Sequence, residues 1–192
     1  MGTIRDHASQ TGLSVNSNNQ AEVHSISEKE IHFYSAIKGQ SYSLVTESSI
    51  AAAKVVALHA KNTSSDKSMV IEDISVHTVA EAATTPAVGV YWTVGVDRTY
   101  ASGGASATPK NMNSGSTNSA EVTAYKTSPT LAGTDTEIHR YYPKTDGEAY
   151  DLSHRGAIVV GPGKNFEISY TSTGTAGRAS ATMYFYMKPV GS

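Results

Sequence analysis

The chain of 192 residues contains no cysteine, one tryptophan and three phenylalanines, and only 17% of its residues are charged. Without cysteine it can form neither a disulfide framework nor a thiolate metal site. No run approaches the roughly 18 consecutive apolar residues of a membrane span, so no membrane partner is expected. The opening stretch MGTIRDHASQTG lacks the apolar core of a signal peptide, and Asp6 stands where an acylation signal needs Ser or Thr.

Positive charge is also scarce. Lys and Arg number 15 against 17 Asp and Glu, which gives a formal net charge of −2. Such a balance provides no basic field for a nucleic-acid backbone or an anionic surface. We therefore expect no nucleic-acid partner.

The sequence is rich in Ser, Thr, Ala and Gly, a mixture typical of β-strands joined by many turns. Residues 1–20 are polar and follow neither a helical nor a strand period, so they predict an N-terminal arm. Residues 21–192 are long enough for one domain with a core of its own. We expect a single domain over that range.

Alternating apolar residues predict the main strands. In residues 87–97 one face collects Val88, Val90, Trp92, Val94 and Val96. In residues 164–172 one face collects Phe166, Ile168 and Tyr170, and in residues 178–188 it collects Ala179, Ala181, Met183, Phe185 and Met187. We expect these faces to meet in one core.

Other segments carry weaker patterns. Residues 51–62 predict a buried strand despite their alanines, and residues 27–39 predict either a short helix or a loop. Residues 68–79 place Val70, Ile74 and Val76 on one face and Met69, Ile71, Ser75 and His77 on the other. The Glu72-Asp73 pair interrupts that strand, which suggests a bulge or an edge. Residues 98–119 predict a long polar loop, and residues 144–156 predict an acidic segment rich in turns.

These segments amount to about eight strands with irregular connections and no repeated βα pattern. The sequence therefore predicts an all-β protein, an antiparallel β-sandwich of jelly-roll type with an extended N-terminal arm.

The residues that could act in catalysis or metal binding do not have the spacing of a known site. No pair of histidines has the spacing of a zinc-binding motif. Asp151, Ser153 and His154 are the residue types of an acyl-transfer triad, but such close neighbours cannot form one. Asp146, Glu148 and Asp151 approximate a loop of oxygen ligands for calcium, for which a solvated turn is the alternative. We predict no catalytic residue, no metal ligand and no cofactor.

A contact surface is indicated more clearly. Tyr184 and Tyr186 face away from the core side of the final strand, and exposed tyrosines are typical of interfaces. Gly89, Tyr91 and Gly95 lie opposite the valine face of their strand, where glycines allow a neighbouring backbone to approach. We expect these five residues to contact another copy of the chain or another partner.

Several stretches resemble those of small jelly-roll proteins of tailed-bacteriophage particles, including capsid decoration (cement) proteins. They are NNQAEVHSIS, KGQSYSLVT, AAAKVVALHAKNTSSDKSMVIEDISV, VVGPGKNFEISYTS and ATMYFYMK. The resemblance implies a structural protein of the virion rather than an enzyme. It further implies a homotrimer that binds the major capsid protein, or another virion protein, on the outer surface of the capsid.

A different function stays open. Jelly rolls also serve as carbohydrate- or receptor-binding modules, as in phage tails and fibres. A sugar platform needs exposed aromatic side chains, which Tyr100, Tyr141, Tyr142 and Tyr150 would supply from predicted loops. Trp92, by contrast, is patterned into the core.

Overall fold

The computed structural model describes residues 14–15, 21–22, 30–79, 90–142, 149–174 and 177–191. In chain order its elements are β1 (Ser14–Val15), β2 (Ala21–Glu22), α1 (Glu30–Ala36), β3 (Ser41–Ser49), β4 (Lys54–Asn62), β5 (Lys67–Val79), β6 (Tyr91–Val96), β7 (Thr99–Ser102), β8 (Ala105–Ala107), β9 (Lys110–Asn111), β10 (Val122–Lys126), β11 (Thr130–Ala132), β12 (Thr136–Tyr141), β13 (Ala149–Val160), β14 (Asn165–Thr171) and β15 (Arg178–Pro189).

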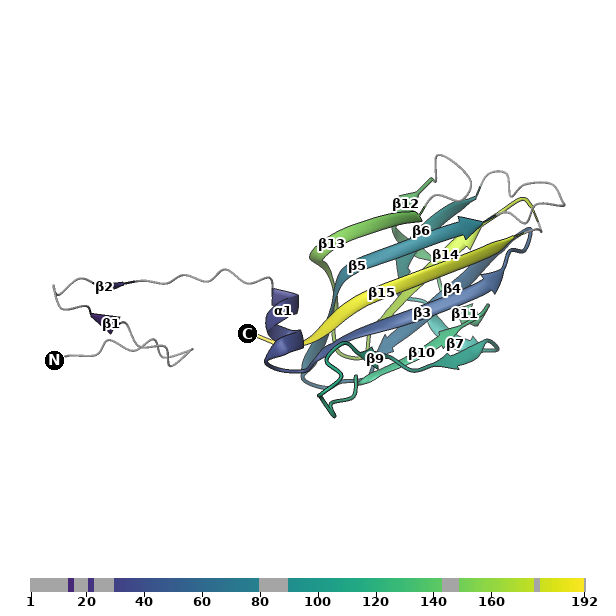
Figure 1. Ribbon diagram of the computed structural model, residues 1–192. Coiled ribbons are helices and arrows are strands. Elements are labelled where there is room, and N and C mark those ends of the chain that lie inside the picture. Colours follow the sequence, from purple (N-terminus) through teal and green to yellow (C-terminus); the bar gives the residue numbers. More distant parts are fainter. Residues whose placement is uncertain are drawn as a thin grey trace.

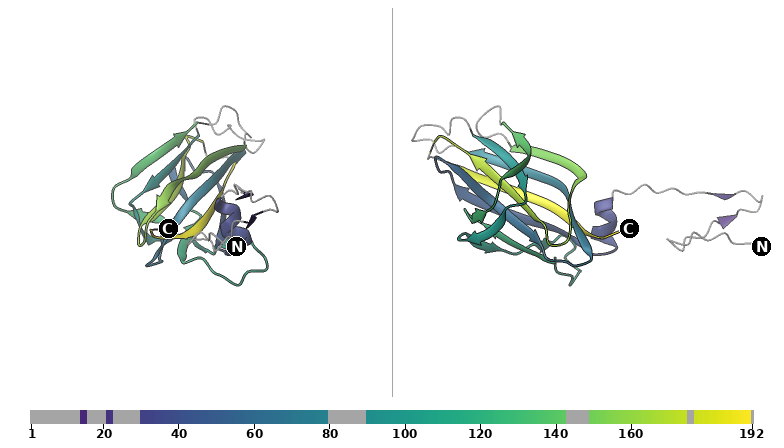
Figure 2. Two further views of the ribbon diagram at one scale, coloured as in Figure 1. Left: turned by 90° about the vertical axis from the view of Figure 1, so that its left-hand side faces the viewer. Right: turned by 180° about the vertical axis from the view of Figure 1, so that it is seen from behind.

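Two antiparallel sheets form a sandwich, which confirms the predicted fold class (Figures 1 and 2). One sheet has the strand order β12-β6-β14-β4-β10-β8, and we call it the β14 sheet. The other has the order β13-β5-β15-β3-β9, and we call it the β15 sheet. Within the described residues β1 pairs with β2 in a separate ladder.

The connections follow the jelly-roll order. From β3 to β6, and again from β12 to β15, each strand is followed by a strand of the opposite sheet. The result is two four-stranded sets, β3-β15-β5-β13 and β4-β14-β6-β12, with the first and last strands side by side. Eight strands distributed in this way define the jelly roll, so the predicted topology is confirmed. Strands β8, β9 and β10 extend the two sheets at one side.

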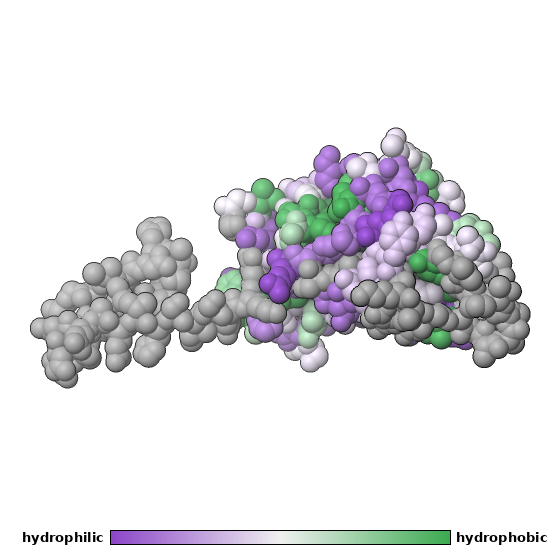
Figure 3. Space-filling model, turned by 90° about the horizontal axis from the view of Figure 1, so that it is seen from above, coloured by the Kyte–Doolittle hydropathy of each residue, from purple (hydrophilic) through white to green (hydrophobic). Residues whose placement is uncertain are grey.

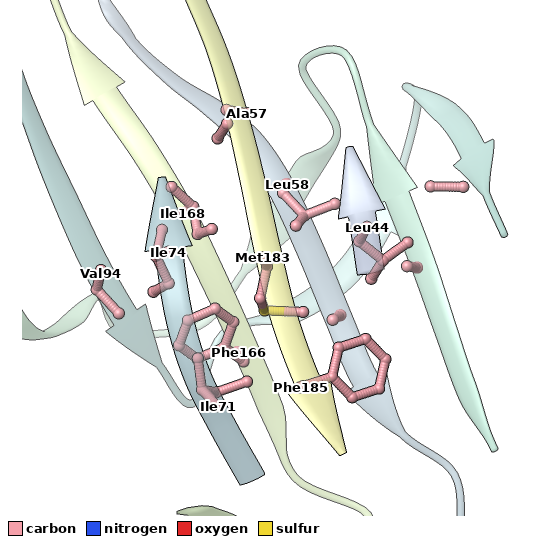
Figure 4. Close-up of a cluster of buried hydrophobic side chains, with 14 of the residues drawn as sticks. Leu44, Ala57, Leu58, Ile71, Ile74, Val94, Phe166, Ile168, Met183 and Phe185 are labelled. Atoms are coloured by element: carbon pink, nitrogen blue, oxygen red, sulfur yellow. The ribbon is translucent and has the colours of Figure 1, made fainter. Parts of the chain in front are cut away.

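The core lies between the two sheets and is formed by the predicted faces (Figure 4). Met183 and Phe185 of β15 are fully buried, as are Phe166 and Ile168 of β14. Trp92 is buried too, and its indole Nε1 donates a hydrogen bond to Thr78 Oγ1 at 3.1 Å. The expected valine face is buried at Val94 and partly buried at Val90 and Val96, while Val88 lies outside the described residues.

The interruption predicted in β5 is a bulge, but the predicted faces on its N-terminal side are wrong. In the pairing with β15, Asp73 lies opposite Tyr184 and Ile71 opposite Phe185, so Glu72 is an extra residue. An extra residue shifts the alternation by one position. Met69 and Ile71 therefore point into the core together with Ile74 and Val76, and Val70 points outward.

Residues 98–119 are not one long loop. A two-stranded ribbon, β8 with β10 and β7 with β11, begins in the β14 sheet and then bends. At the bend Gly103 and Gly104 on one strand, and Thr127 and Ser128 on the other, all have positive φ angles. Because of this bend, β7 lies over the outer face of the β14 sheet.

The rest of that segment is fixed by asparagine side chains. Asn111 Nδ2 donates to Gly39 O at 2.9 Å, and Asn118 Nδ2 donates to Lys38 O at 2.9 Å. Asn113 Nδ2 donates to Ser35 O at 3.0 Å. Carbonyl groups at the C-terminal end of a helix lack hydrogen-bond donors within the helix. The asparagine amides are the donors here. The polar segment is thus ordered by α1.

Helix α1 confirms the helical alternative for residues 27–39 and ends before Gly39, whose φ is +58°. Its Tyr34 stacks on Tyr186 of β15 with ring centroids 4.9 Å apart. The helix therefore lies on the outer face of the β15 sheet, at one end of it (Figure 1). Across the described ranges, no helix has the length and apolar character needed to cross a membrane.

The turn-rich prediction for residues 144–156 is wrong over its second half, because Ala149–Val160 is the edge strand β13. Between Ser153, opposite Asp73, and Ile158, opposite Ile71, the strand carries a large bulge. Arg155 and Gly156 have φ angles of 48° and 76° within it. The bulge breaks the alternation that would have marked a strand in the sequence.

Candidate functional site

The two candidate tyrosines of β15 have different surroundings. Tyr184 is half-buried and lies on the outer face of the β15 sheet, as predicted. Tyr186 points to the same side but is only 2% exposed, because Tyr34 of α1 covers its ring. The predicted exposure of Tyr186 is therefore wrong. Its partner is a helix of the same chain.

The candidates on the outer side of β6 also have partners within the chain. Gly95 is buried, and a Cβ atom there would lie 3.0 Å from Glu167 Oε1. The space expected for a neighbouring chain is thus filled by a side chain of β14. Tyr91 is half-buried with the Arg140 guanidinium 4.8 Å from its ring centroid. Gly89 lies outside the described residues.

The candidate cation loop is represented by Asp151 alone. It is an exposed residue of β13 opposite Ser75, whereas Asp146 and Glu148 lie outside the described residues. Throughout the part of the chain that the structure describes, no three His, Asp or Glu side chains are placed to hold a metal ion.

The outer face of the β15 sheet is built mainly of small side chains. Its rows, in register across β3, β15, β5 and β13, are Ser43, Tyr184, Asp73; Val45, Thr182, Ser75, Asp151; Glu47, Ser180, His77; and Ser49, Arg178, Val79. We call these residues the β15 outer face. Glu47 and Arg178 pair with each other at 2.7 Å, and Val45 is 56% exposed. Figure 1 looks onto this face, with α1 at one end.

Two ring pairs join the sheets where β12 and β13 form their edges. Tyr141 stacks on Tyr150 at 3.6 Å between centroids, and His139 meets His154 edge to face at 5.5 Å. These tyrosines lie on strands rather than in the predicted loops. Burial, with a further contribution from His139, lowers the pKa of His154, although Asp73 opposes this. Figure 3 shows this side of the molecule, where an apolar patch adjoins a polar band.

A pocket of about 290 Å³ opens on the outer face of the β14 sheet, where β7 lies over it. It is lined by His59, Lys61, Thr63, Thr99, Tyr100, Thr123, Tyr125 and Asn165. We call it the His59 pocket. Tyr100 and Tyr125 stack in parallel, with centroids 3.6 Å apart and an interplanar angle of 3°. They form a rigid aromatic wall.

An ion pair lies next to the pocket. Glu167, opposite His59 in register, is 2% exposed, and both of its carboxylate oxygens accept hydrogen bonds from Arg98. The Nε of Arg98 donates at 2.8 Å. Bidentate pairing of this kind occupies both oxygens of the carboxylate. Glu167 is therefore neutralised where it is buried.

His59 is 1% exposed, and its Nε2 lies 3.3 Å from the backbone carbonyl of Arg98. A carbonyl only accepts, so Nε2 carries the proton. Burial lowers the pKa of His59, and the charges of Arg98 and Lys61 lower it further, while the contacts with the Arg98 carbonyl and Asn165 raise it. The ring is therefore neutral at pH 7, and Nδ1 is an acceptor.

The neighbour of that acceptor is the side chain of Asn165, which stands beside the ring. With its amide turned by 180°, the Asn165 nitrogen donates to Nδ1. His59 Nδ1 and Asn165 Oδ1 are both buried, so neither atom is presented to the pocket.

Sequence reasoning missed this pocket because it considered the histidines only for the spacing of a zinc-binding motif and placed Tyr100 in a loop. The pocket exists because β7 bends over the β14 sheet. One local signal was present, since Gly103-Gly104 is a pair that favours left-handed backbone at a turn.

Comparison with known proteins gives no further indication of function. The proposals below therefore rest on the residues just described. No family model matches the chain, and neither a curated protein nor a solved structure matches it significantly.

Proposed function

We propose that the chain is a non-enzymatic structural protein of a virus particle, which binds the outside of the capsid as a decoration protein. In this proposal it is a homotrimer and its partner is the major capsid protein. The jelly-roll order supports the proposal by analogy, since capsid proteins use this architecture. The resemblance of its strand sequences to phage decoration proteins points the same way.

The observation that carries the proposal is the composition of the β15 outer face. Ser, Thr and Val side chains lose little conformational entropy when a partner covers them, whereas the Lys and Glu of a solvated face lose more. Seven of the thirteen residues in these rows are Ser, Thr or Val. The charged residues are Asp73, Asp151 and the paired Glu47 and Arg178, and Lys110 of β9 continues the row of Ser43. Tyr184 adds an aromatic side chain of the kind enriched at interfaces. Such a face suits packing against another copy of the chain.

The position of α1 also favours the β15 outer face as the contact surface. Residues 1–29 precede α1 in the sequence, and Tyr34 holds α1 at one end of the β15 outer face. Residues 1–20 contain few apolar side chains, so contacts with a particle rather than a core of their own would order them. Three copies on a threefold position would strengthen a weak individual contact through effective concentration.

Sedimentation of three proteins tests the oligomer. We expect the unaltered protein and Thr123→Arg to sediment as trimers at micromolar concentration, and Thr182→Arg to sediment as a monomer. Both substitutions place arginine on the outer side of a strand, but only Thr182 lies on the β15 outer face. An unaltered protein that is monomeric, or equal sedimentation of the two variants, would refute the proposed interface.

Deletion of residues 1–20 tests attachment to the particle. The shortened protein should remain folded and trimeric but bind capsids more weakly than the full chain, as measured by cosedimentation. Capsid binding that is unchanged by the deletion would contradict a role of this region in attachment.

A second candidate function, carbohydrate or receptor binding, is favoured by one specific observation. The His59 pocket combines the stacked Tyr100 and Tyr125 with the threonines Thr63, Thr99 and Thr123. Tyr100 is the one member of the four tyrosines proposed for a sugar platform that lines this pocket.

A further inference from the structure

Two exposed apolar features lie at the end of the β15 sheet that carries α1, and we infer that they bind each other between neighbouring copies of the chain. One is the pair Phe33 and Ile37 of α1, which we call the α1 knob. The other is a hollow of about 260 Å³ on the sheet beside it. The inference deepens the proposed function, since it rests on the proposed trimer and names the parts of two copies that meet.

The α1 knob is an apolar pair on the outward side of a helix. Phe33 and Ile37 are four residues apart, a spacing that places two side chains next to each other on a helix. They are 38% and 66% exposed, whereas Tyr34 of the same helix is buried against the sheet. Large apolar side chains that are exposed together are typical of a contact surface.

The hollow continues the β15 outer face by one row. In that row Tyr186, Val70 and Val159 lie side by side in register, and all three line the hollow. Tyr186 and Val70 form its floor and are nearly covered already. The surface open to a partner comes from Val159 and Val190, which are 58% and 60% exposed. We call it the Val159 hollow.

The bulge of β13 leaves room in this hollow. Gly156 lines it with a φ of +76°, and a Cβ atom there would lie 3.3 Å from Val70 Cγ1. The same atom would lie 3.4 Å from the hydroxyl oxygen of Tyr186. A side chain at residue 156 would therefore begin to fill the space above the floor.

A copy cannot fill its own Val159 hollow with its own α1 knob. The helix is fixed on the sheet by the stacking of Tyr34 on Tyr186. The amides of Asn113 and Asn118 also hold it, through the carbonyls of Ser35 and Lys38. In this orientation the knob is left exposed beside the end of β15 (Figure 1). The occupant that the chain itself supplies is thus the knob of a second copy.

The symmetry of a trimer calls for two such features. In a cyclic trimer each copy presents one surface to the next copy and a different surface to the preceding one. A single self-complementary patch builds a twofold dimer instead. The α1 knob and the Val159 hollow are different surfaces of the same apolar character, so their contact can repeat around a ring.

The charges near the two features do not oppose the contact. Lys38 Nζ lies 5.6 Å from the centroid of the Phe33 ring and accompanies the knob. At the hollow, Lys188 is part of the lining, and Glu72 lies close to Gly156. Since the hollow has charges of both signs, it brings no net positive charge toward Lys38. Apolar contact therefore decides the fit.

Disulfide cross-linking tests the contact directly, because the chain has no cysteine of its own. Full-length proteins with Phe33→Cys or Ile37→Cys are each co-expressed with a tagged protein that carries Val159→Cys or Val190→Cys, and are then oxidised. We expect at least one pairing to give a disulfide between tagged and untagged chains on a non-reducing gel. Such a bond forms only where two Cα atoms come within about 7 Å. Each variant alone, and Ile37→Cys paired with Tyr142→Cys, should stay uncross-linked.

Sedimentation of arginine variants gives a second measurement. Ile37→Arg and Val159→Arg each place a charge in the apolar contact from an exposed position. Both should lose the trimer at micromolar concentration and sediment as monomers. Ile138→Arg is the matched control, since Ile138 is 46% exposed on the edge strand of the other sheet. It should remain trimeric.

The outcomes separate this inference from the proposed function. A trimer that persists in both arginine variants, without a cross-link in any pairing, would overturn the inference and leave the trimer standing. A trimeric Val159→Arg protein that no longer binds capsids would assign the hollow to a capsid protein and would overturn the inference too. A monomeric unaltered protein would refute both. Cross-linked copies that fail to bind capsids would support the inference and contradict the decoration function alone.

Discussion

Trp92 is the largest buried side chain of the core, and its removal tests how the core is built. The indole is 1% exposed, contacts Tyr170 and donates to Thr78 Oγ1. Trp92→Ala should lower the free energy of unfolding by about 3–5 kcal/mol, since it loses buried apolar area and leaves a cavity. Urea denaturation followed by circular dichroism measures this difference.

Tyr142→Ala is the matched control for that experiment. Tyr142 is 59% exposed, so its truncation should change the stability by no more than about 0.5 kcal/mol. A Trp92→Ala protein as stable as Tyr142→Ala would contradict the assignment of Trp92 to the core.

At the scale of single residues, the sequence predicted inward positions well and outward positions poorly. Alternation identified Trp92, Phe166 and Met183 as core residues, because the apolar face of a strand is buried between the sheets of a sandwich. His59 and Glu167 occupy outward positions of their strands, where polar residues are expected to be solvated. Their burial depends on the neighbouring segment of residues 98–102, and strand periodicity contains no information about such cover.

At the scale of elements, the bent ribbon depends on backbone that most residues avoid. Gly104 has a φ of +68°, and a Cβ atom there would lie 2.7 Å from the carbonyl oxygen of Lys126. Gly104→Ala should therefore destabilise the protein by about 1–3 kcal/mol through backbone strain and the clash. Hydrogen exchange of β7 should become faster, because the ribbon is held by this bend.

Gly115→Ala is the control for the ribbon. Gly115 has no positive φ, and the nearest atom to an added Cβ would be Asn113 Oδ1 at 3.4 Å. Its stability and its β7 exchange should match those of the unaltered protein. Equal exchange of β7 in Gly104→Ala and Gly115→Ala would show that the bend does not depend on glycine.

Among the elements, the long strands could be predicted and their irregularities only in part. The polar Glu72-Asp73 pair correctly predicted a bulge, but the sequence could not show that Glu72 is the extra residue. The first half of strand β13 was missed because Arg155 and Gly156 interrupt its alternation, whereas AIVV, residues 157–160, predicts a short strand and belongs to β13. The asparagines of residues 111–118 act on α1 through contacts between segments far apart in sequence. Local patterns do not reveal such contacts.

At the scale of the whole molecule, buried histidines make stability depend on pH. Burial lowers the pKa of His59 and His154 below the value of about 6.5 expected in the unfolded chain. Below that value the unfolded state binds protons that the folded state does not, so stability is full above it and falls with acidification. The slope from His59 alone has an upper limit of about 1.4 kcal/mol per pH unit, the value for one proton.

Urea denaturation between about pH 7.5 and pH 5.5 measures this slope, a window above the titration of the carboxylates. The His59→Phe protein should lose the larger part of the dependence, and His32→Phe should keep all of it. An unchanged slope in His59→Phe would show that His59 binds protons equally in the folded and unfolded states.

The jelly-roll order fixes when the molecule can be completed during synthesis. Strand β15 is the last strand of the sandwich in sequence order, yet it lies between β3 and β5 in the middle of its sheet. Until it emerges, β3 and β5 each present an unpaired edge, and unpaired edges pair with other chains. A nascent chain or a C-terminal truncation before residue 178 would therefore be a substrate for chaperones and proteases. The sandwich can therefore be completed only after β15 has been synthesised.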